Sequence, residues 1–206
     1  MATVFSHAVA ALGIGACFYR PGIPKRVWAL GALCAAAPDL DVIGFALGVD
    51  YGDPFGHRGF THSLFFAALL ALAMAGLVFA RGAPRLGRFS LWMYFFLATA
   101  SHGFLDSMTN GGLGVAFFAP FDNSRYFLPW TPIQVSPIGI TNFIADGGLA
   151  VFPSEFLWIW LPSASLAAIA LLARRQELSF GANIFTSRKY SPHPSNGKES
   201  QQKRRN

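Results

Sequence analysis

The sequence predicts an all-α membrane protein, a polytopic helical bundle of about five spans with a long outer loop segment. Two features of the composition carry this prediction. Hydrophobic residues make up 53% of the 206 residues and charged residues only 13%, about half of the roughly 25% found in soluble domains. The mean hydropathy is +0.40. This composition excludes a disordered chain, a coiled coil and an ordinary soluble enzyme, and the two cysteines exclude a disulfide scaffold.

Five apolar runs account for the predicted spans, because a spanning helix needs about 20 apolar residues. They cover residues 4–19, 27–47, 63–80, 89–108 and 156–173. The third and fifth runs are uncharged and are the clearest spans. The first is short and glycine-rich, and because no basic segment precedes it, we do not interpret it as a cleaved signal peptide. Pro38 lies inside the second run and is expected to break or kink that helix.

The lysines and arginines predict the orientation. Basic residues cluster at 20–26, at 81–88 and after residue 173, where eight of the 16 are found. The positive-inside rule places these three segments in the cytoplasm. The N-terminus, the 48–62 loop and the 110–154 segment are then outside, and the C-terminus is inside. This pattern is typical of membrane topology rather than of a basic groove, so we do not expect a nucleic-acid partner despite the net charge of +6.

We expect the chain to have two parts. Residues 1–178 form a membrane-embedded domain that carries a metal site, and residues 179–206 form a basic, disordered cytoplasmic tail. The 110–154 segment is rich in glycine, proline and aromatic residues. We interpret it as an ordered loop on the membrane face, with room for short strands. The lipid bilayer is the expected surrounding, and no oligomeric state follows from the sequence.

Seven ionisable residues in or beside the apolar runs need an explanation, because charged groups inside a span cost roughly 2.5–3.5 kcal/mol each on insertion scales. They are His7, Asp39, Asp41, His57, His62, His102 and Asp106. The predicted topology puts all seven toward the outer side, so they can form a single site near the outer leaflet. His102 and Asp106 are four residues apart and share one helix face, where an imidazole and a carboxylate can hold one divalent ion.

Asp39 and Asp41 point to different sides of a regular helix. They converge on one ion only if Pro38 distorts the backbone, or if one binds the metal and the other orients a ligand. Histidine and aspartate without cysteine suit zinc, with manganese or iron as alternatives. Seven candidates exceed the ligands of one zinc ion, so one or two ions are predicted. The alternatives left open are a helix cap by the aspartates, a hydrogen-bonded His–Asp pair on the fourth run and an interfacial histidine on the first.

These residues belong to a set of short motifs. The motifs are His7, Pro38-Asp39-Leu40-Asp41, His57-Arg58-Gly59-Phe60-Thr61-His62-Ser63, and Ser101-His102 with Asp106. In this combination the chain resembles the bacterial inner-membrane proteins described as membrane-bound metal-dependent hydrolases, which include a LexA-regulated member. The resemblance covers about residues 1–140. That family is distantly similar to zinc-dependent phospholipase C and to fungal zinc nucleases, whose His-x-x-x-Asp element is matched by His102 and Asp106.

The motifs and the resemblance together predict a metal-dependent hydrolase at the periplasmic face of the inner membrane. Its substrate is expected to be a phosphoester or a lipid-linked phosphate, because the site lies at headgroup depth. Asp39 or Asp41 would be the general base, and Arg58 and Arg125 would bind an anionic group. The 110–154 segment is expected to fold back as a lid that brings Arg125 near the metal. A metal or proton transporter and a structural protein whose metal only holds helices together are the alternatives.

Overall fold

The computed structural model describes residues 1–82 and 86–189. Its regular elements are helices: α1 (Val4–Phe18), α2 (Lys25–Ala36), η1 (Ala37–Val42), α3 (Ile43–Ala46), η2 (Phe60–His62), α4 (Leu64–Ala80), α5 (Arg88–Ser107), α6 (Ile140–Ala145), η3 (Gly148–Val151), α7 (Phe152–Glu155), η4 (Phe156–Trp160) and α8 (Leu161–Lys189). The all-α class is confirmed. Within the described residues the 110–154 segment, which had room for short strands, forms none, and pairing is limited to two isolated bridges, Thr109 with Ile133 and Val115 with Tyr126.

Two helical stretches in the described part of the chain are long and apolar enough to cross a membrane, Lys25–Ala46 and Gly148–Gln176. The apolar helices Val4–Phe18 and Leu64–Val78 are shorter. α1 has 15 residues, which corresponds to about 22 Å of helix, less than the roughly 30 Å of a bilayer core. The structure therefore identifies two candidate spans where the sequence predicts five.

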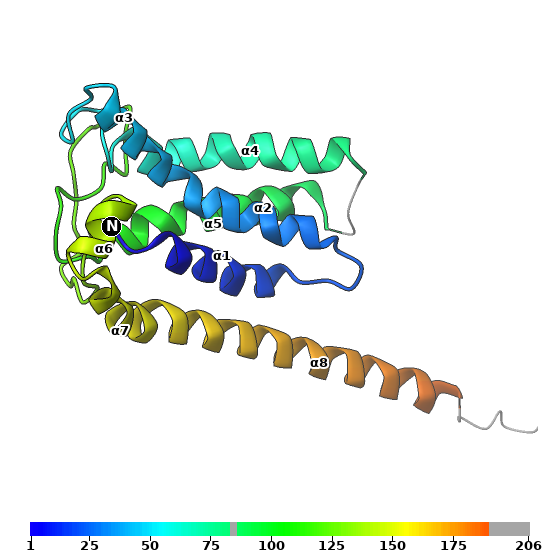
Figure 1. Ribbon diagram of the computed structural model, residues 1–206. Coiled ribbons are helices and arrows are strands. Elements are labelled where there is room, and N and C mark those ends of the chain that lie inside the picture. Colours follow the sequence, from blue (N-terminus) through cyan, green and yellow to red (C-terminus); the bar gives the residue numbers. More distant parts are fainter. Residues whose placement is uncertain (83–85, 190–206) are drawn as a thin grey trace, which may run out of the picture. The chain divides into compact units, whose positions relative to one another are not determined.

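Four helices of the first unit of the chain run side by side (Figure 1). α5 contacts α1, α2 and α4. The N-terminus and the long loops gather at one end of these helices, and the α1–α2 and α4–α5 connections lie at the other end. A core that includes Leu91, Tyr94 and Phe95 of α5 extends toward these connections, packed against alanines of α1, α2 and α4.

Pro38 changes the second run as predicted. α2 ends at Ala36, and the next six residues form the 3₁₀ helix η1 with Pro38 in its first turn. Proline has no backbone N–H and clashes with the preceding turn of an α-helix, so the backbone tightens to the 3₁₀ pattern. The side chains of Asp39 and Asp41 therefore project from a distorted backbone. Both carboxylates approach the ring of His62, Asp39 at Nε2 and Asp41 at Nδ1.

The segment 108–139 has no helix and is tied to other parts of the chain by backbone hydrogen bonds. The Leu128 amide donates to the Ser107 carbonyl at the end of α5 (2.9 Å), and the Ala116 amide donates to the Arg58 carbonyl (3.0 Å). This loop is therefore tied both to α5 and to the His57–Ser63 motif, the two regions that supply most of the ionisable residues.

Contacts divide the chain into two units, Met1–Leu171 and the residues from Leu172 onward, with the boundary inside α8. From the sequence, the boundary is expected at residue 178. α8 continues to Lys189, so the first part of the predicted disordered tail is helical in the structure. The rest of that prediction, residues 190–206, lies outside the described residues.

A buried carboxylate fixes the start of α1. Glu155 is completely buried. It accepts hydrogen bonds from the Thr3 amide (2.5 Å), the Thr3 hydroxyl (2.6 Å) and the Ser6 hydroxyl (2.6 Å). Thr3 is the N-cap residue of α1, and its side chain makes no capping hydrogen bond to a backbone amide of the helix. The carboxylate from α7 therefore supplies the negative charge that stabilises a helix N-terminus.

Replacing this carboxylate tests its contribution. Glu155→Gln is expected to lower the free energy of unfolding by about 1.5–3 kcal/mol, the usual contribution of hydrogen bonds to a charged group. Unfolding of the purified protein in detergent, followed by circular dichroism, measures the change. The exposed Asp146 gives the control variant Asp146→Asn, which should change the free energy of unfolding little. Equal effects of the two substitutions would contradict the capping role.

Candidate metal centre

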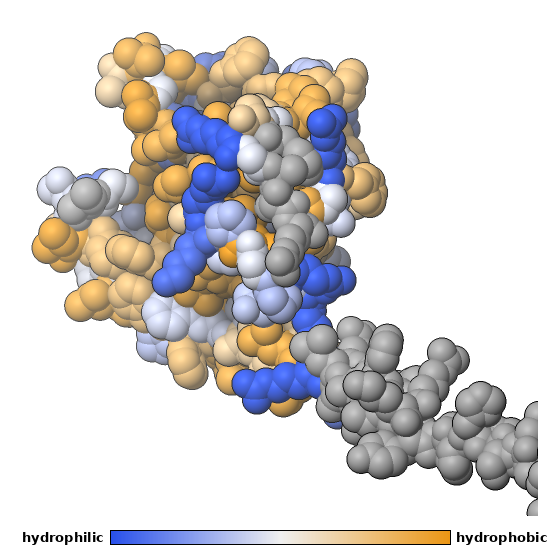
Figure 2. Space-filling model, turned by 90° about the vertical axis from the view of Figure 1, so that its right-hand side faces the viewer, coloured by the Kyte–Doolittle hydropathy of each residue, from blue (hydrophilic) through white to orange (hydrophobic). Residues whose placement is uncertain are grey.

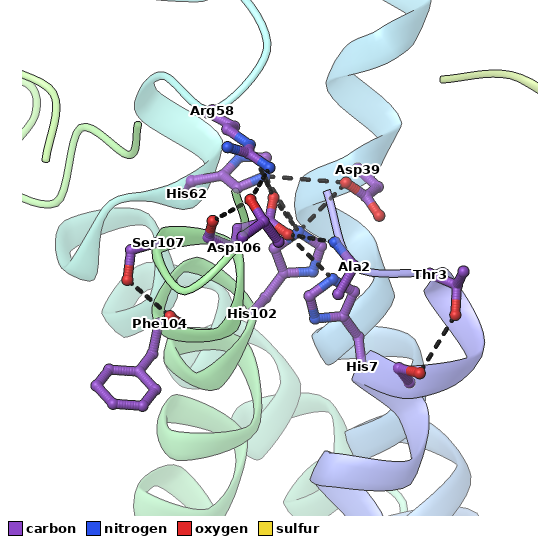
Figure 3. Close-up of polar contacts among 12 residues, drawn as sticks. Ala2, Thr3, His7, Asp39, Arg58, His62, His102, Phe104, Asp106 and Ser107 are labelled. Atoms are coloured by element: carbon purple, nitrogen blue, oxygen red, sulfur yellow. Dashed lines mark hydrogen bonds and ion pairs between the residues drawn. The ribbon is translucent and has the colours of Figure 1, made fainter. Parts of the chain in front are cut away.

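Four parts of the chain bring the predicted ionisable residues together near the N-terminus of α1 (Figure 3). α1 supplies His7, η1 supplies Asp39 and Asp41, the motif loop and η2 supply His57, Arg58 and His62, and α5 supplies His102 and Asp106. These side chains are buried, and the side chain of Asp41 is only 2% exposed. The structure thus collects all seven predicted ligands and one of the two predicted arginines in one region.

His102 is oriented by a backbone carbonyl. Its Nδ1 lies 2.6 Å from the Ala35 oxygen at the end of α2. A carbonyl oxygen only accepts hydrogen bonds, so Nδ1 carries the proton. The Nε2 atom of the neutral ring therefore offers a lone pair, and it faces the neighbouring ligand candidates. This is the arrangement in which metal-binding histidines are held in proteins.

His62 is oriented in the same way by a carboxylate. Its Nδ1 lies 3.2 Å from Asp41 Oδ2 and 3.1 Å from Thr61 Oγ1, while the Thr61 hydroxyl donates to that carboxylate oxygen (2.7 Å). Burial disfavours the charged form of His62, but Asp106 and Asp41 favour it more strongly, and its pKa is raised to about 9. These negative surroundings attract a cation to Nε2, either a proton or a metal ion.

Four ligand atoms, one from each of Asp39, His62, His102 and Asp106, lie within 4.8 Å of one another. The two Nε2 atoms are 3.1 Å apart. His102 Nε2 is 3.2 Å from Asp39 Oδ1, and His62 Nε2 is 3.6 Å from Asp106 Oδ2. Ligands at 2.0–2.1 Å from a tetrahedral zinc are about 3.3 Å apart. The spacing of these four atoms therefore fits a four-coordinate metal ion.

The carboxylates of this group have few hydrogen-bond partners. Both oxygens of Asp39 and Oδ2 of Asp106 are buried without a hydrogen bond to the described residues, although buried polar atoms are nearly always hydrogen-bonded. Counting charges, Asp39, Asp41 and Asp106 contribute three negative charges and Arg58 one positive charge. The Met1 amino group, which interacts electrostatically with Asp106, adds a second positive charge where it is protonated, so −1 to −2 is left when the histidines are neutral. A buried charge of this size is very unfavourable without a counter-ion, and a divalent cation balances it.

Protons can balance this charge in a different way. A single proton between the two Nε2 atoms makes an N–H···N hydrogen bond across 3.1 Å. A second proton on this pair would put two N–H groups face to face, because the Nδ1 atom of His102 already carries a proton for the Ala35 carbonyl, so it would have to lie on another group such as His7, whose Nε2 is 3.6 Å from Asp106 Oδ1. A divalent metal in contact with both Nε2 atoms balances the charge without two opposed N–H groups.

Asp41 differs from Asp39 because hydrogen bonds occupy its carboxylate. It accepts from His57 Nδ1 (2.7 Å), the Arg58 amide (3.2 Å) and Thr61 (2.7 Å), besides its contact with His62. Asp41, His57 and His62 form a second group of closely spaced ligand atoms, but here the atoms are already hydrogen-bonded to one another. These contacts favour Asp41 as the residue that orients His57 and His62, and its predicted roles as ligand and general base stay predictions.

His7 lies beside the four-atom group. Its ring stacks on that of His102, with centroids 3.6 Å apart, and its Nε2 is 3.6 Å from Asp106 Oδ1. Neither ring nitrogen has a hydrogen-bond partner among the described residues. The structure therefore puts His7 close enough to share a charge or a proton with Asp106.

Arg58 is fully buried and reaches the cluster from a left-handed backbone conformation, with φ of 63°. Its Nε is 3.2 Å from Asp106 Oδ2. Its terminal nitrogens donate to the Gly111 carbonyl and to Thr109 Oγ1, both at 2.8 Å. The guanidinium thus neutralises a predicted ligand and holds the 108–139 segment. Its predicted role in substrate binding stays a prediction.

Gly103 lets the motif loop approach α5, and Gly59 lets this loop fold closely against the preceding residues. A Cβ atom at Gly103 would lie 2.7 Å from the His62 carbonyl oxygen, and one at Gly59 would lie 2.3 Å from the Pro54 oxygen. Cβ atoms essentially never come this close to another heavy atom. Gly103 therefore allows η2 to lie directly against α5, which brings His62 beside His102.

Arg125 joins the 108–139 segment to the 51–57 loop. Its guanidinium donates to the carbonyls of His57 (2.8 Å), Tyr51 (3.0 Å) and Asp53 (3.0 Å), and it lies over the Tyr51 ring at 5.8 Å from the centroid. These contacts support a role in holding the loops together. The role as an anion clamp near the metal stays a prediction.

The two roles of Arg125 make different predictions. As a loop anchor, Arg125→Met should lower the free energy of local opening of residues 50–57 by about 1.5–3 kcal/mol and leave the metal content unchanged. Hydrogen–deuterium exchange of this peptide measures the effect, and Arg20→Met, at an exposed arginine, is the control. Unchanged exchange together with weaker phosphate-ester turnover would favour the anion clamp.

Several residues that shape the site were not identified from the sequence. The Ala35 carbonyl and Thr109 carry no recognisable signal, because backbone carbonyls and single hydroxyls are too common. Thr61 lies inside the motif loop but was not given a role. Glu155 did carry a signal, since it is a lone carboxylate at the start of an apolar run, where ionisable residues are rare.

Fold and site together define a helical membrane protein with a buried cluster of histidines and aspartates that can hold a metal ion. The chain belongs to the YdjM inner membrane protein family, whose model matches residues 1–178. It is 39% identical over 175 residues to the inner membrane protein YbcI of Escherichia coli strain K12, which covers 85% of this chain and all of that protein. No solved structure matches the chain. Location in the inner membrane follows from this family.

Proposed function

We propose that the chain is an inner-membrane metalloprotein that hydrolyses a phosphoester or a lipid-linked phosphate. Its metal ion, zinc before manganese or iron, would lie among Asp39, His62, His102 and Asp106. The observation that supports this proposal is the set of four buried ligand atoms with a surplus of negative charge, in which both oxygens of Asp39 and Oδ2 of Asp106 have no hydrogen-bond partner among the described residues.

The residues around the ion suit this chemistry. A bound divalent metal supplies a water molecule with a pKa near 7 and polarises the phosphoryl oxygen. In the hydrolase, His62, His102 and Asp106 would hold the ion and leave its fourth position to this water. Asp39 would then be the general base, because its oxygens accept no hydrogen bonds from the described residues, whereas those of Asp41 accept several. His7, beside Asp106, is in a position to pass a proton.

We also propose a five-span topology with the N-terminus outside and the C-terminus inside. The α1–α2 and α4–α5 connections lie at the end of the helices opposite the candidate metal centre (Figure 1). They carry basic residues, Arg20, Lys25 and Arg26 at the first connection and Arg81 and Arg88 at the second. With these basic residues in the cytoplasm, the metal centre would face the periplasm. A substrate carried by the outer leaflet would then be the nearest phosphoester.

A metal that only holds helices together is the second candidate, and one observation favours it. Structural zinc sites have four protein ligands and no open position, and here four buried ligand atoms surround the proposed ion. The transporter is less well supported, because the core beyond the cluster is built from apolar residues and a single tyrosine and offers no chain of ionisable groups in the described residues.

Metal analysis combined with a hydrolysis assay tests the proposal. The purified protein should contain about one divalent ion per chain, and the loaded protein should release phosphate or an alcohol from a phospholipid or a lipid-linked phosphate. Asp39→Asn should remove turnover. Metal without turnover on any phosphoester would overturn the hydrolase proposal and favour the structural metal, and the absence of metal would overturn both.

A further inference from the structure

A groove lies between α4 and α5, on the part of these helices that is farthest from the metal centre. Its volume is about 530 Å³, and it is lined by Leu72, Ala75, Gly76, Ala80, Arg88, Phe89 and Trp92. The metal centre, with its ligands on η1, η2 and the other end of α5, shares none of these residues. The groove therefore needs an explanation of its own.

Small residues on α4 and aromatic residues on α5 form the groove. A Cβ atom at Gly76 would meet no other atom within 4 Å, so the α4 side is open. On the α5 side the Phe89 and Trp92 rings stack with centroids 6.0 Å apart. Trp92 Nε1 donates to the Ala68 carbonyl of α4 at 3.3 Å, which fixes this aromatic wall against the neighbouring helix.

The length of the groove suits one leaflet. The eight steps from Leu72 to Ala80 along α4 correspond to about 12 Å, close to the roughly 15 Å that each leaflet contributes to the hydrocarbon core. Its walls are apolar apart from Arg88, which is exposed at the first turn of α5. An extended hydrocarbon chain with a negative group at one end has the matching chemistry.

The surface at this end of the helices is positively charged. Figure 2 faces this end and shows hydrophilic side chains gathered among hydrophobic ones. Arg26 donates to the Arg81 carbonyl at the end of α4 (3.1 Å), so a second guanidinium lies near the helix end that borders the groove. The N-terminus of α5 adds the positive end of its helix dipole.

We propose that this groove binds one acyl chain of an anionic phospholipid, whose phosphate lies at Arg88. Arginine pairs well with phosphate oxygens, and the cytoplasmic leaflet, where the proposed topology puts this end, is rich in anionic lipids. A second copy of the chain fits less well. A two-fold symmetric dimer in one membrane would bring the two Arg88 side chains toward each other at the shared groove, and like charges there are unfavourable.

Native mass spectrometry of the purified protein with phosphatidylglycerol and with phosphatidylcholine of identical chains tests this proposal. The wild type should retain phosphatidylglycerol at least fivefold better, since one basic residue near the surface contributes about that factor. Gly76→Leu fills the open space and should weaken binding of both lipids about tenfold. Arg88→Gln should remove the difference between the lipids and retain the weaker chain binding.

Two controls make the result specific. Arg20→Gln removes another exposed arginine from the same end and should leave the preference intact. Circular dichroism must show unchanged helicity for Gly76→Leu, and Leu72→Phe narrows the same groove from a second position. Equal retention of the two lipids by the wild type, or unchanged binding in both groove variants, would overturn the proposal. A dimer that only the groove variants dissociate would assign the groove to a second copy instead.

Discussion

His102→Ala is expected to remove the divalent metal from the purified protein. The variant loses the Nε2 atom that lies 3.1 Å from His62 Nε2 and 3.2 Å from Asp39 Oδ1. Loss of a residue that only orients a ligand weakens metal binding by about 10–100-fold, and loss of a ligand should cost more than that. The affinity of the wild type and the variant, measured by competition with a chelator, should differ by well over 100-fold.

His57→Ala is the matched control for this experiment. His57 contacts the cluster through its hydrogen bond to Asp41, so its loss should weaken binding by about 10–100-fold without changing the number of ions bound. If the wild type binds two ions and His57→Ala binds one, the second group of ligand atoms holds an ion of its own. If His102→Ala retains metal with unchanged affinity, the proposed centre is wrong.

Arg58→Met is expected to destabilise the metal-free protein by about 3–5 kcal/mol, because removal of one partner from a buried ion pair leaves the other charge uncompensated. Here the partner is Asp106, whose side chain is fully buried with that of Arg58. Addition of metal should recover part of the loss, since the ion supplies positive charge to the same carboxylate. The midpoint of thermal unfolding, measured with and without zinc, reports both effects.

The control for this prediction is Arg20→Met, at an exposed arginine outside the cluster. It should not change how strongly zinc raises the unfolding temperature. A larger zinc-dependent rise in Arg58→Met than in the wild type supports a shared counter-ion role for Arg58 and the metal. An equal rise in all three proteins would mean that Arg58 acts on the fold alone and does not compensate the charge of Asp106.

The sequence was sufficient for the helical class and for the set of ionisable residues, because both depend on local patterns. The i, i+4 spacing of His102 and Asp106 defines one helix face, and Pro38 predicts the distortion of the second run. The number of spans was harder to predict. α1 is a helix of the predicted apolar run, but whether about 22 Å of helix crosses a bilayer depends on tilt and on neighbouring helices, which no local pattern contains.

The different surroundings of the two aspartates in the site could not be predicted either. Asp39 and Asp41 are two residues apart in one motif, yet their surroundings differ completely. Asp41 meets four donors from the motif loop, whereas Asp39 faces His62 and His102 with its oxygens unpartnered. The difference arises from the close approach of η2 to α5 at Gly103, a contact between distant parts of the chain that leaves no trace in either motif.

The cluster also sets the order in which the protein can be assembled. Asp106 accepts a hydrogen bond from the Ala2 amide, across 104 positions of the chain. At a synthesis rate of about 5–20 residues per second, Asp106 emerges roughly 5–20 seconds after Ala2. During that interval the segment that carries Asp39 is already made, but α5 with its histidine and aspartate is not. Until α5 is made, Asp39 lacks its neighbour His102, and the site can close only when α5 supplies His102 and Asp106.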